Sequence, residues 1–171
     1  MTSVPALATA MAEGLDRDVL TAATRRGFVA ALRILKNRDE AEEACQEAAA
    51  RAWAARDRYD PSRPFYAWYH RILKNLCLDR LASRNNKPAD PEAAEQLPSE
   101  ATQESSMLAA EDERRVHAAI EALPEDLRAV IELRHFEDAS YAEMADILEI
   151  PIGTVMSRLY RARKTLKEAL S

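Results

Sequence analysis

One segment, just past the middle of the chain, constrains the fold more than any other. Residues 85–106 contain three prolines, several acidic residues and many small ones, with no hydrophobic periodicity. Such a composition buries too little apolar surface to offset the entropy lost on ordering the chain. We therefore expect a flexible linker over 85–106 between two small domains at 15–84 and 107–171, preceded by a disordered N-terminus over 1–14.

Both domains are expected to be all-α. The 171 residues include only three glycines, are rich in Ala, Leu, Glu and Arg, and lack strand-like runs of β-branched and aromatic residues. Apolar residues at steps of three and four predict three helices in the first domain and four in the second. The expected helices cover 16–36, 40–57, 65–83, 107–122, a segment beginning at Pro124, a segment after Ser140, and a last one ending near Ala169.

Local signals refine these helices. Asp39 with Glu42, and Ser140 with Glu143, have the spacing of capping boxes. Pro124 suits the first turn of its helix because its missing N–H would have no partner there. The expected core stripe of the third helix consists of Phe65, Trp68, Ile72, Leu76 and Leu78 or Asp79.

Charge is distributed unevenly along a chain whose formal net charge is −5. Residues 56–87 hold eight bases against three acids, residues 88–113 hold eight acids and no base, and residues 154–167 hold five bases and no acid. Two basic blocks therefore flank an acidic spacer, an arrangement that a uniformly charged surface would not have.

The remaining bulk features point to an intracellular protein without a metal. Cys45 and Cys77 fall within helical apolar patterns and lack metal-ligand neighbours, so buried reduced thiols are expected. Three scattered histidines make no metal site, and no cofactor is expected. With no signal peptide and no membrane-length apolar run, the expected location is the cytoplasm, without membrane contact.

The last two helices have the spacing of a helix-turn-helix, whose second helix enters the major groove of DNA. Its expected buried stripe is Val155, Leu159, Ala162 and Leu166. The opposite side presents two polar stripes: Met156, Tyr160, Arg163 and Lys167, and Ser157, Arg161 and Lys164 with Arg158 beside them. A solvated basic face is the alternative, but the capped preceding helix and the tight break favour DNA binding.

Both domains resemble extracytoplasmic-function sigma factors of the sigma-70 family. The stretches Leu123–Arg128, Ser140–Ala145 and Pro151–Arg163 are similar to the family's fourth region, and Asp39–Glu47, Phe65–Asn75 and Asp79-Arg80 to its second region. The resemblance implies an alternative sigma factor, a non-catalytic subunit that directs core RNA polymerase to promoters, opens them and starts transcription, in a stress or envelope response. It also implies an anti-sigma factor as inhibitor and a free state that is monomeric.

The resemblance also assigns residues to roles. Contacts with core polymerase, its β and β′ subunits, fall to Gln46, Glu47 and Arg51. Contacts with the −10 element fall to Tyr59, Asp60, Ser62, Arg63, Trp68, Arg71, Lys74, Asn75 and Arg80. Among these, Tyr59 suits stacking on a flipped base, whereas the place of Trp68 on the apolar stripe favours core packing. Contacts with the −35 element fall to Thr154, Ser157, Arg158, Tyr160, Arg161, Arg163 and Lys164.

This chain departs from the family at several positions. Met156 stands where Lys or Arg is frequent, so one −35 contact is lost or becomes apolar. Glu149 stands where Gly or Asp ends a helix, and a left-handed Glu there is mildly strained. Tyr69 replaces a usual Leu, and Ala48-Ala49-Ala50 predicts a thin core.

Three other functions are weaker interpretations. A sigma mimic that only titrates an anti-sigma factor would have no need for the basic helix, and known mimics carry a further receiver domain. A simple helix-turn-helix repressor leaves the first domain unexplained. An enzyme is least favoured, because paired catalytic carboxylates, an activated nucleophile and a phosphate-binding glycine loop are not apparent in the sequence.

Overall fold

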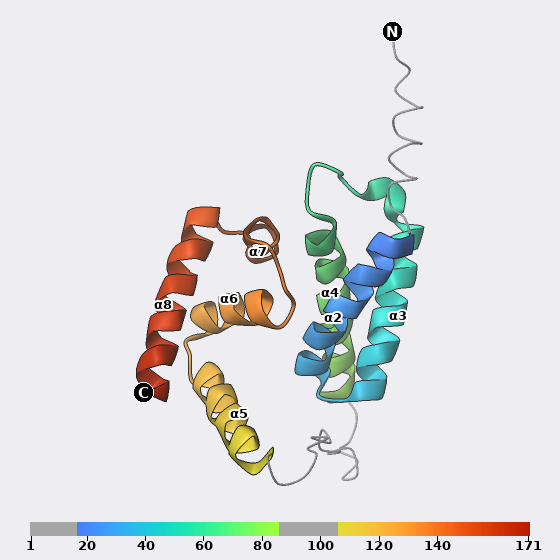
Figure 1. Ribbon diagram of the computed structural model, residues 1–171. Helices are drawn as coiled ribbons and strands as arrows, with labels where there is room; N and C mark the ends of the chain where they lie inside the picture. The colour runs from blue at the N-terminus through green and yellow to red at the C-terminus, as the bar shows by residue number, and fades with distance from the viewer. Residues whose placement is uncertain (1–16, 86–105) are drawn as a thin grey trace. The chain divides into compact units, whose positions relative to one another are not determined.

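The structure, a computed structural model, describes residues 17–85 and 106–171, with side chains from 111 onward in the second range. The chain divides into two compact units, Met1–Leu97 and Pro98–Ser171. All regular secondary structure in the described ranges is helical (Figure 1), which confirms the all-α expectation. The N-terminus expected to be disordered, and all of the expected linker except its helical ends Asn85 and Ser106, lie outside the described residues.

The first unit is a bundle of three helices in mutual contact. They are α2 (Arg17–Leu35), α3 (Arg38–Ala54) and α4 (Phe65–Asn85), with a short 3-10 turn, η1 (Arg56–Arg58), after α3. The three expected helices are therefore present. The largest boundary error concerns α3, which was expected over 40–57 and lies two to three residues earlier.

The start of α3 differs from the capping box expected at Asp39 and Glu42. The N-cap is Asn37, which has extended dihedrals of φ −139° and ψ 125° and whose side chain accepts from the Glu40 N–H at 3.0 Å. Lys36 turns the chain between the helices with a left-handed φ of 56°. Asn is among the strongest N-cap residues, so it starts the helix before the acidic pair.

The buried face of α4 is rotated from the expected stripe. The residues that α4 buries are Tyr66, Ala67, Tyr69, His70, Leu73, Leu76 and Cys77. Of the predicted stripe only Leu76 is fully buried, while Leu78 is 48% exposed. Two tyrosines occupy the core, and the Tyr69 hydroxyl donates to the Cys45 carbonyl at 3.2 Å, which satisfies its polar end.

Small side chains make up most of the buried surface of α2 and α3. The buried alanines are Ala23, Ala30 and Ala31 on α2 and Ala41, Ala44, Ala48 and Ala52 on α3. Gly27 lets α2 approach α4, because a Cβ at this position would lie 2.7 Å from Leu73 Cδ2 and 2.9 Å from Tyr69 Cε1. Cys45 and Cys77 are buried free thiols, as expected.

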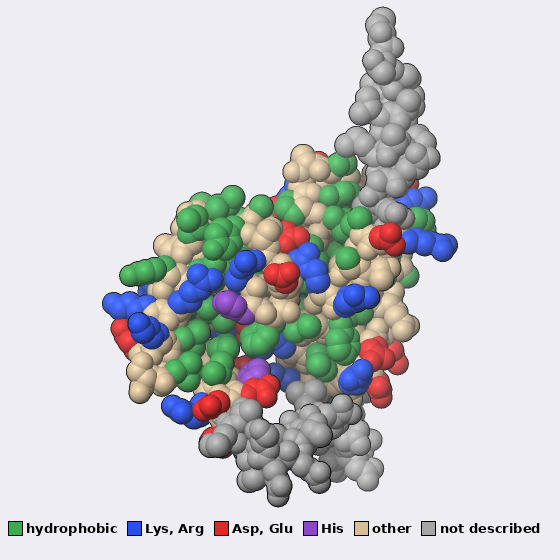
Figure 2. Space-filling view, in the orientation of Figure 1, with side chains coloured by type: hydrophobic (Ala, Val, Ile, Leu, Met, Phe, Trp, Pro, Cys, Tyr) green, Lys and Arg blue, Asp and Glu red, His purple; other side chains and the backbone are tan. Residues whose placement is uncertain are grey.

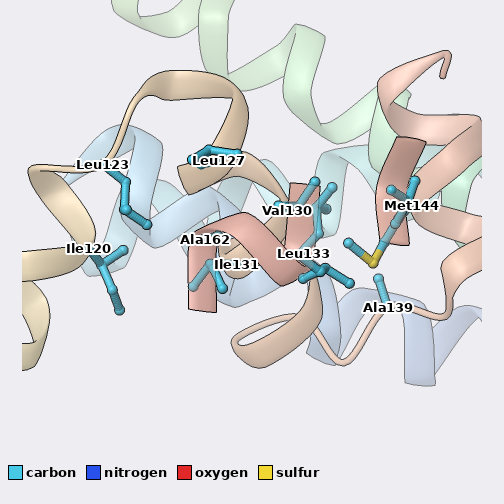
Figure 3. Close-up of a cluster of buried hydrophobic side chains, with 11 residues drawn as sticks. Ile120, Leu123, Leu127, Val130, Ile131, Leu133, Ala139, Met144 and Ala162 are labelled. Atoms are coloured by element: carbon cyan, nitrogen blue, oxygen red, sulfur yellow. The ribbon is translucent and has the colours of Figure 1, made fainter. Parts of the chain in front are cut away.

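The second unit consists of α5 (Ser106–Glu121), α6 (Glu125–His135), α7 (Tyr141–Leu148) and α8 (Ile152–Leu170), and α8 contacts the other three. Pro124 is the N-cap of α6, not a residue of its first turn. Leu, Ile and Val make up most of this unit's core, and Met144 extends toward Leu133 and Ala139 (Figure 3). The cluster is formed by Ile120, Leu123, Leu127, Val130, Ile131, Leu133, Ala139, Met144, Val155, Leu159 and Ala162.

Two features of the described ranges bear on possible functions. None of the helices there combines the length and apolar character that a membrane span requires. Within the same ranges, no three His, Cys, Asp or Glu side chains gather as metal ligands would.

Candidate nucleic-acid interface

Local hydrogen bonds define both ends of α7 and so the turn that leads into α8. Ser140 and Glu143 form the expected capping box: the Ser140 N–H donates to Glu143 Oε2 at 2.8 Å, and the Glu143 N–H donates to Ser140 Oγ at 3.2 Å. Glu149 takes the expected left-handed conformation, φ 55° and ψ 42°, and the Ile150 N–H bonds to the Ala145 carbonyl at 3.1 Å. The capping box starts α7, and the left-handed Glu149 with the Ile150 bond ends it and directs the chain into α8.

The two sides of α8 differ sharply in character. Val155, Leu159 and Ala162 are buried as expected, and Leu166 packs against the same cluster. The predicted DNA contacts Ser157, Tyr160, Arg161, Arg163 and Lys164 are exposed, while Thr154 and Arg158 are half-buried. Figure 2 shows blue Lys and Arg side chains among green hydrophobic ones over the surface where Figure 1 draws α8. An exposed, mostly basic helix side supported by a hydrophobic core is suited to a DNA groove.

Arg158 and Ser157 make internal contacts. The Arg158 Nε atom lies 3.5 Å from Asp126 Oδ2, so this guanidinium leans on the start of α6. The Ser157 hydroxyl donates to the Thr154 carbonyl at 3.0 Å, which leaves its oxygen lone pairs available as acceptors. Of the predicted −35 residues, Arg158 is thus held by an ion pair.

His135, at the C-terminal end of α6, lies within electrostatic reach of α8. Its pKa is lowered by partial burial and by the positive charges of Arg163 and Arg134. The imidazole therefore stays neutral at neutral pH and adds no charge to this side of the unit.

In the first unit, three aromatic rings meet beside the loop that precedes α4. The Tyr59 ring centroid lies 5.3 Å from that of Phe65, edge to face, and 5.3 Å from that of Trp68. The Tyr59 hydroxyl donates to the Arg63 carbonyl at 2.6 Å, and partial burial followed by the Asp60 charge raises the Tyr59 pKa. Trp68 is half-buried in this cluster and is not a member of the central core that was expected for it.

A second set of bonds closes the same loop. Asp60 Oδ1 accepts from the Ser62 N–H at 2.9 Å, and the Asp60 carbonyl accepts from the Arg63 N–H at 3.1 Å. The bonds from Ser62 hold the Asp60 pKa below its ordinary value, so the carboxylate is ionised at neutral pH. With Pro61 and Pro64 limiting the backbone, the loop over 59–64 is folded without any ligand.

The exposed side of α4 continues from this loop. Arg71, Lys74 and Asn75 are exposed, and the spacing of Trp68, Arg71 and Asn75 places these three on one stripe. An aromatic ring, an amide and two basic residues therefore lie together next to the folded loop. This combination can stack on a base, bond its edge and neutralise phosphate.

Ion pairs join α3 to the C-terminal half of α4. Arg80 Nη1 lies 3.2 Å from Glu43 Oε2, and Arg80 Nη2 lies 3.1 Å from Glu47 Oε2. Glu47 is shared with Arg51, and Arg84 pairs with Glu40. Hydrogen bonds from Arg80 and Arg51 lower the Glu47 pKa.

These ion pairs engage several residues that the sequence analysis predicted to contact DNA or polymerase. Arg80 was predicted to contact the −10 element, but its guanidinium faces the two α3 carboxylates. The predicted polymerase contacts Glu47 and Arg51 are paired with each other, while Gln46 is exposed beside them. Sequence analysis missed Trp53, which is 43% exposed with the Arg56 guanidinium 5.1 Å from its ring. The available signal was the place of Trp53 near the end of α3, between two alanines and two residues after Arg51.

Comparisons with known proteins give the same division into two parts. The family profile described as Sigma-70 region 2 matches residues 23–87, and that described as Sigma-70, region 4 matches residues 113–166. These ranges hold, respectively, the folded loop with α4 and the helix-turn-helix.

Curated relatives match across both parts. The chain is 34% identical over 149 residues to the RNA polymerase sigma-H factor of Pseudomonas aeruginosa, covering 81% of this chain and 77% of that protein. It is 35% identical over 150 residues to the ECF RNA polymerase sigma factor SigW of Bacillus subtilis, covering 81% and 79%. A solved structure of the sigma factor RpoE from Bartonella quintana, in complex with the anti-sigma factor NepR, matches with 25% identity, a TM-score of 0.59 and coverage of 90% and 94%. The chain therefore belongs to the extracytoplasmic-function sigma factors of the sigma-70 family.

Proposed function

We propose that this sigma factor reads the −35 element with α8 and the −10 element with the loop over 59–64 and α4, while α3 docks on core RNA polymerase. The observation that carries the proposal is the sidedness of α8. Its buried stripe fixes the helix on α5, α6 and α7, and its other side presents four cations on residues 154–167 with no acid among them. DNA phosphates supply the matching negative charge.

At the −35 element, the exposed residues divide by chemistry. Arg161 and Arg163 bond guanine edges or phosphates, and Ser157 and Tyr160 meet base edges. Thr154 and Lys164 bond phosphates. Arg158, which leans on Asp126, supports the helix and reaches DNA only by leaving that ion pair.

At the −10 element, the folded loop receives a base extruded from the non-template strand. Extrusion costs a few kcal/mol of unstacking, and an aromatic contact returns about 1–3 kcal/mol per base. Tyr59 and Trp68 supply rings, and Asn75 bonds the base edge. Asp60 and Ser62 maintain the loop by their mutual hydrogen bonds. Backbone phosphates are met by Arg63, Arg71 and Lys74, and by Arg80 when it exchanges its α3 carboxylates for phosphate.

Docking on polymerase uses the exposed side of α3. Gln46, Glu47 and Arg51 contact the β and β′ subunits. The lowered pKa keeps Glu47 charged throughout the neutral range, so a basic surface on polymerase competes with Arg80 and Arg51 for its carboxylate. The sigma factor itself is non-catalytic, and polymerase performs the chemistry.

Control by a partner completes the proposal. The Bartonella quintana relative was solved with an anti-sigma factor bound, which supports an anti-sigma factor as inhibitor of this monomeric chain as well. We place its action in the cytoplasm, where the transcription machinery works, in a stress or envelope response.

The test is run-off transcription with purified full-length chain, core bacterial RNA polymerase and fragmented genomic DNA, followed by sequencing of transcript ends. We expect starts downstream of one shared pair of −35 and −10 elements. Arg161→Ala should reduce initiation at these promoters about tenfold or more, because one good bidentate base contact is worth about 1–3 kcal/mol. Asn75→Ala should leave −35 binding intact and reduce promoter opening, measured by permanganate footprinting of unpaired thymines.

The matched control is Arg114→Ala, which removes an exposed arginine of α5 paired with Glu111 at 3.4 Å. Initiation by this variant should equal that of the unchanged chain. If the folded chain gives no initiation above core polymerase alone, the proposal is wrong, and a mimic that only binds an anti-sigma factor becomes the better hypothesis.

A further inference from the structure

An exposed apolar stripe runs along the recognition side of α8. Ile152 is 47% exposed, Met156 53% and Tyr160 72%, and each lies one helical turn from the next. Other exposed large apolar side chains in the described ranges, such as Val19 and Val116, are not arranged in such a run. Three adjacent turns with apolar exposure indicate a contact surface.

The fold does not need this stripe for its own packing. The core contacts of α8 are made by Val155, Leu159 and Ala162, which are fully buried on another side of the helix. Because Met156 and Tyr160 extend into solvent, changing their chemistry leaves the core intact. The side-chain chemistry at these two positions can therefore suit a binding partner without affecting the core.

The charges around the stripe identify that partner as DNA. Arg161, Arg163 and Lys164 are exposed next to it, and residues 154–167 contain no acid. A protein that covered the apolar stripe would also bury these cations, which is unfavourable unless each finds a counter-charge. A DNA groove provides a phosphate row for the cations and base edges for the stripe.

The apolar group that a base pair displays in the major groove is the C5-methyl of thymine. We propose that Met156 and Tyr160 form a methyl-reading edge, so that this sigma factor selects thymine in its −35 element at the position facing Met156. A thioether chain is flexible and polarizable, and fits a methyl group without requiring a hydrogen bond. The inference rests on the proposed role of α8 in −35 recognition and assigns its base preference.

The experiment uses the holoenzyme, formed from the full chain and core polymerase. Synthetic promoter duplexes carry the −35 element mapped by run-off transcription, and each thymine in it is replaced singly by deoxyuridine, which removes only the methyl group. We expect the replacement facing Met156 to weaken binding about fourfold, the value of one buried methyl-sized group. Replacements outside the −35 element should have no effect.

Three variants isolate the contact. Met156→Leu keeps an apolar side chain and should keep both the thymine preference and the deoxyuridine effect. Met156→Arg should bind thymine and deoxyuridine equally and should prefer guanine at that position in a −35 library. Val116→Arg adds the same charge at an exposed apolar position of α5 and should change neither preference.

The outcomes separate this inference from the proposed function. If binding depends on the −35 sequence and on Arg161, but no deoxyuridine replacement weakens it, the methyl-reading edge is wrong and −35 recognition stands. The inference is also wrong if Met156→Arg leaves the base preference unchanged, or if Met156→Arg impairs only the binding of a protein inhibitor. If the holoenzyme shows no sequence preference at all, both proposals are wrong.

Discussion

A single residue, Gly27, allows α2 to pack closely against α4. The atoms that a Cβ would meet belong to Tyr69 and Leu73, at 2.9 Å and 2.7 Å. Both of these side chains are fully buried, so they have little room to move away. The absence of a side chain at Gly27 therefore sets the distance between the two helices.

Replacing this glycine should destabilise the first unit. We expect Gly27→Ala to lower the free energy of unfolding by about 1–3 kcal/mol through overpacking, although alanine is the better helix former by about 1 kcal/mol. Urea unfolding followed by circular dichroism measures the change. Ala22→Gly, an exposed position on the same helix, should lower it by only about 0.5–1 kcal/mol. A more stable Gly27→Ala protein would contradict the close approach.

The two thiols should be protected in the folded protein. Burial raises the pKa of Cys45 to about 12 and that of Cys77 to about 11, from an ordinary value of 9.0. Because the thiolate is the reactive form, alkylation at neutral pH should follow unfolding, and mass spectrometry should find both thiols modified only in denaturant. The unfolded chain ionises first, so stability should fall as pH rises through 9. Rapid labelling of the native protein would show that a thiol is accessible.

At the scale of elements, the sequence predicted which segments form helices better than it predicted which side of each helix is buried. The pattern of α8 gave the correct buried stripe because its apolar and basic residues segregate cleanly. In α4 the pattern is mixed: Tyr66 and Tyr69 enter the core, where the Tyr69 hydroxyl bonds to the Cys45 carbonyl, while Trp68 packs on Tyr59 from the preceding loop. The orientation of α4 depends on contacts between residues that are far apart in the chain, and local periodicity does not reveal such contacts.

The same reason limits what sequence says about the candidate site. The residues of α8 are close to one another in the chain, and so are those of the loop over 59–64. Each grouping could therefore be predicted. The ion pairs of Arg80 with Glu43 and Glu47 join residues more than thirty positions apart, with a separation of 33 for the Glu47 bond. Charge type alone assigned Arg80 to phosphate, and only the packing of α4 on α3 reveals its carboxylate partners.

Gly153 leads to a prediction about the first turn of α8. A Cβ there would meet no atom within 4 Å, and its φ is not positive, so the fold does not require glycine. Gly153→Ala should therefore raise the free energy of unfolding, by up to about 1 kcal/mol. If the open space serves close approach of DNA, the same variant should bind the −35 duplex more weakly. Urea unfolding and fluorescence anisotropy measure the two effects, and unchanged DNA binding would show that the space has no role.

The ion pairs between α3 and α4 predict a pH dependence. The Glu47 pKa is lowered from 4.5 by its bonds to Arg80 and Arg51, so the unfolded chain takes up this proton first as pH falls. The contribution of Glu47 to stability is present above pH 4.5 and is lost as pH falls through the lowered value. Stability of the unchanged chain and of Glu47→Gln should therefore differ at pH 7 and converge in acid. A difference that persists at low pH would assign the effect to packing instead.

At the scale of the whole molecule, the two compact units should unfold as separate events. Each has a core of its own, and Gly27 and Met144 belong to different cores. Met144→Ala should destabilise its unit by about 2–5 kcal/mol. In calorimetry we expect two transitions, with Gly27→Ala lowering one and Met144→Ala lowering the other. A single transition shifted by either variant would mean that the units unfold together.

The alanines buried on α2 and α3 have a consequence for how this protein tolerates change. Truncation of alanines such as Ala31, Ala41 and Ala48 removes a single methyl group, but any larger side chain must push packed neighbours apart. The second unit behaves in the opposite way, because its Leu, Ile and Met side chains leave cavities when shortened. A saturation library scored for folding should therefore find that the buried alanine positions of the first unit reject added bulk, and that the buried Leu, Ile and Met positions of the second unit reject its loss.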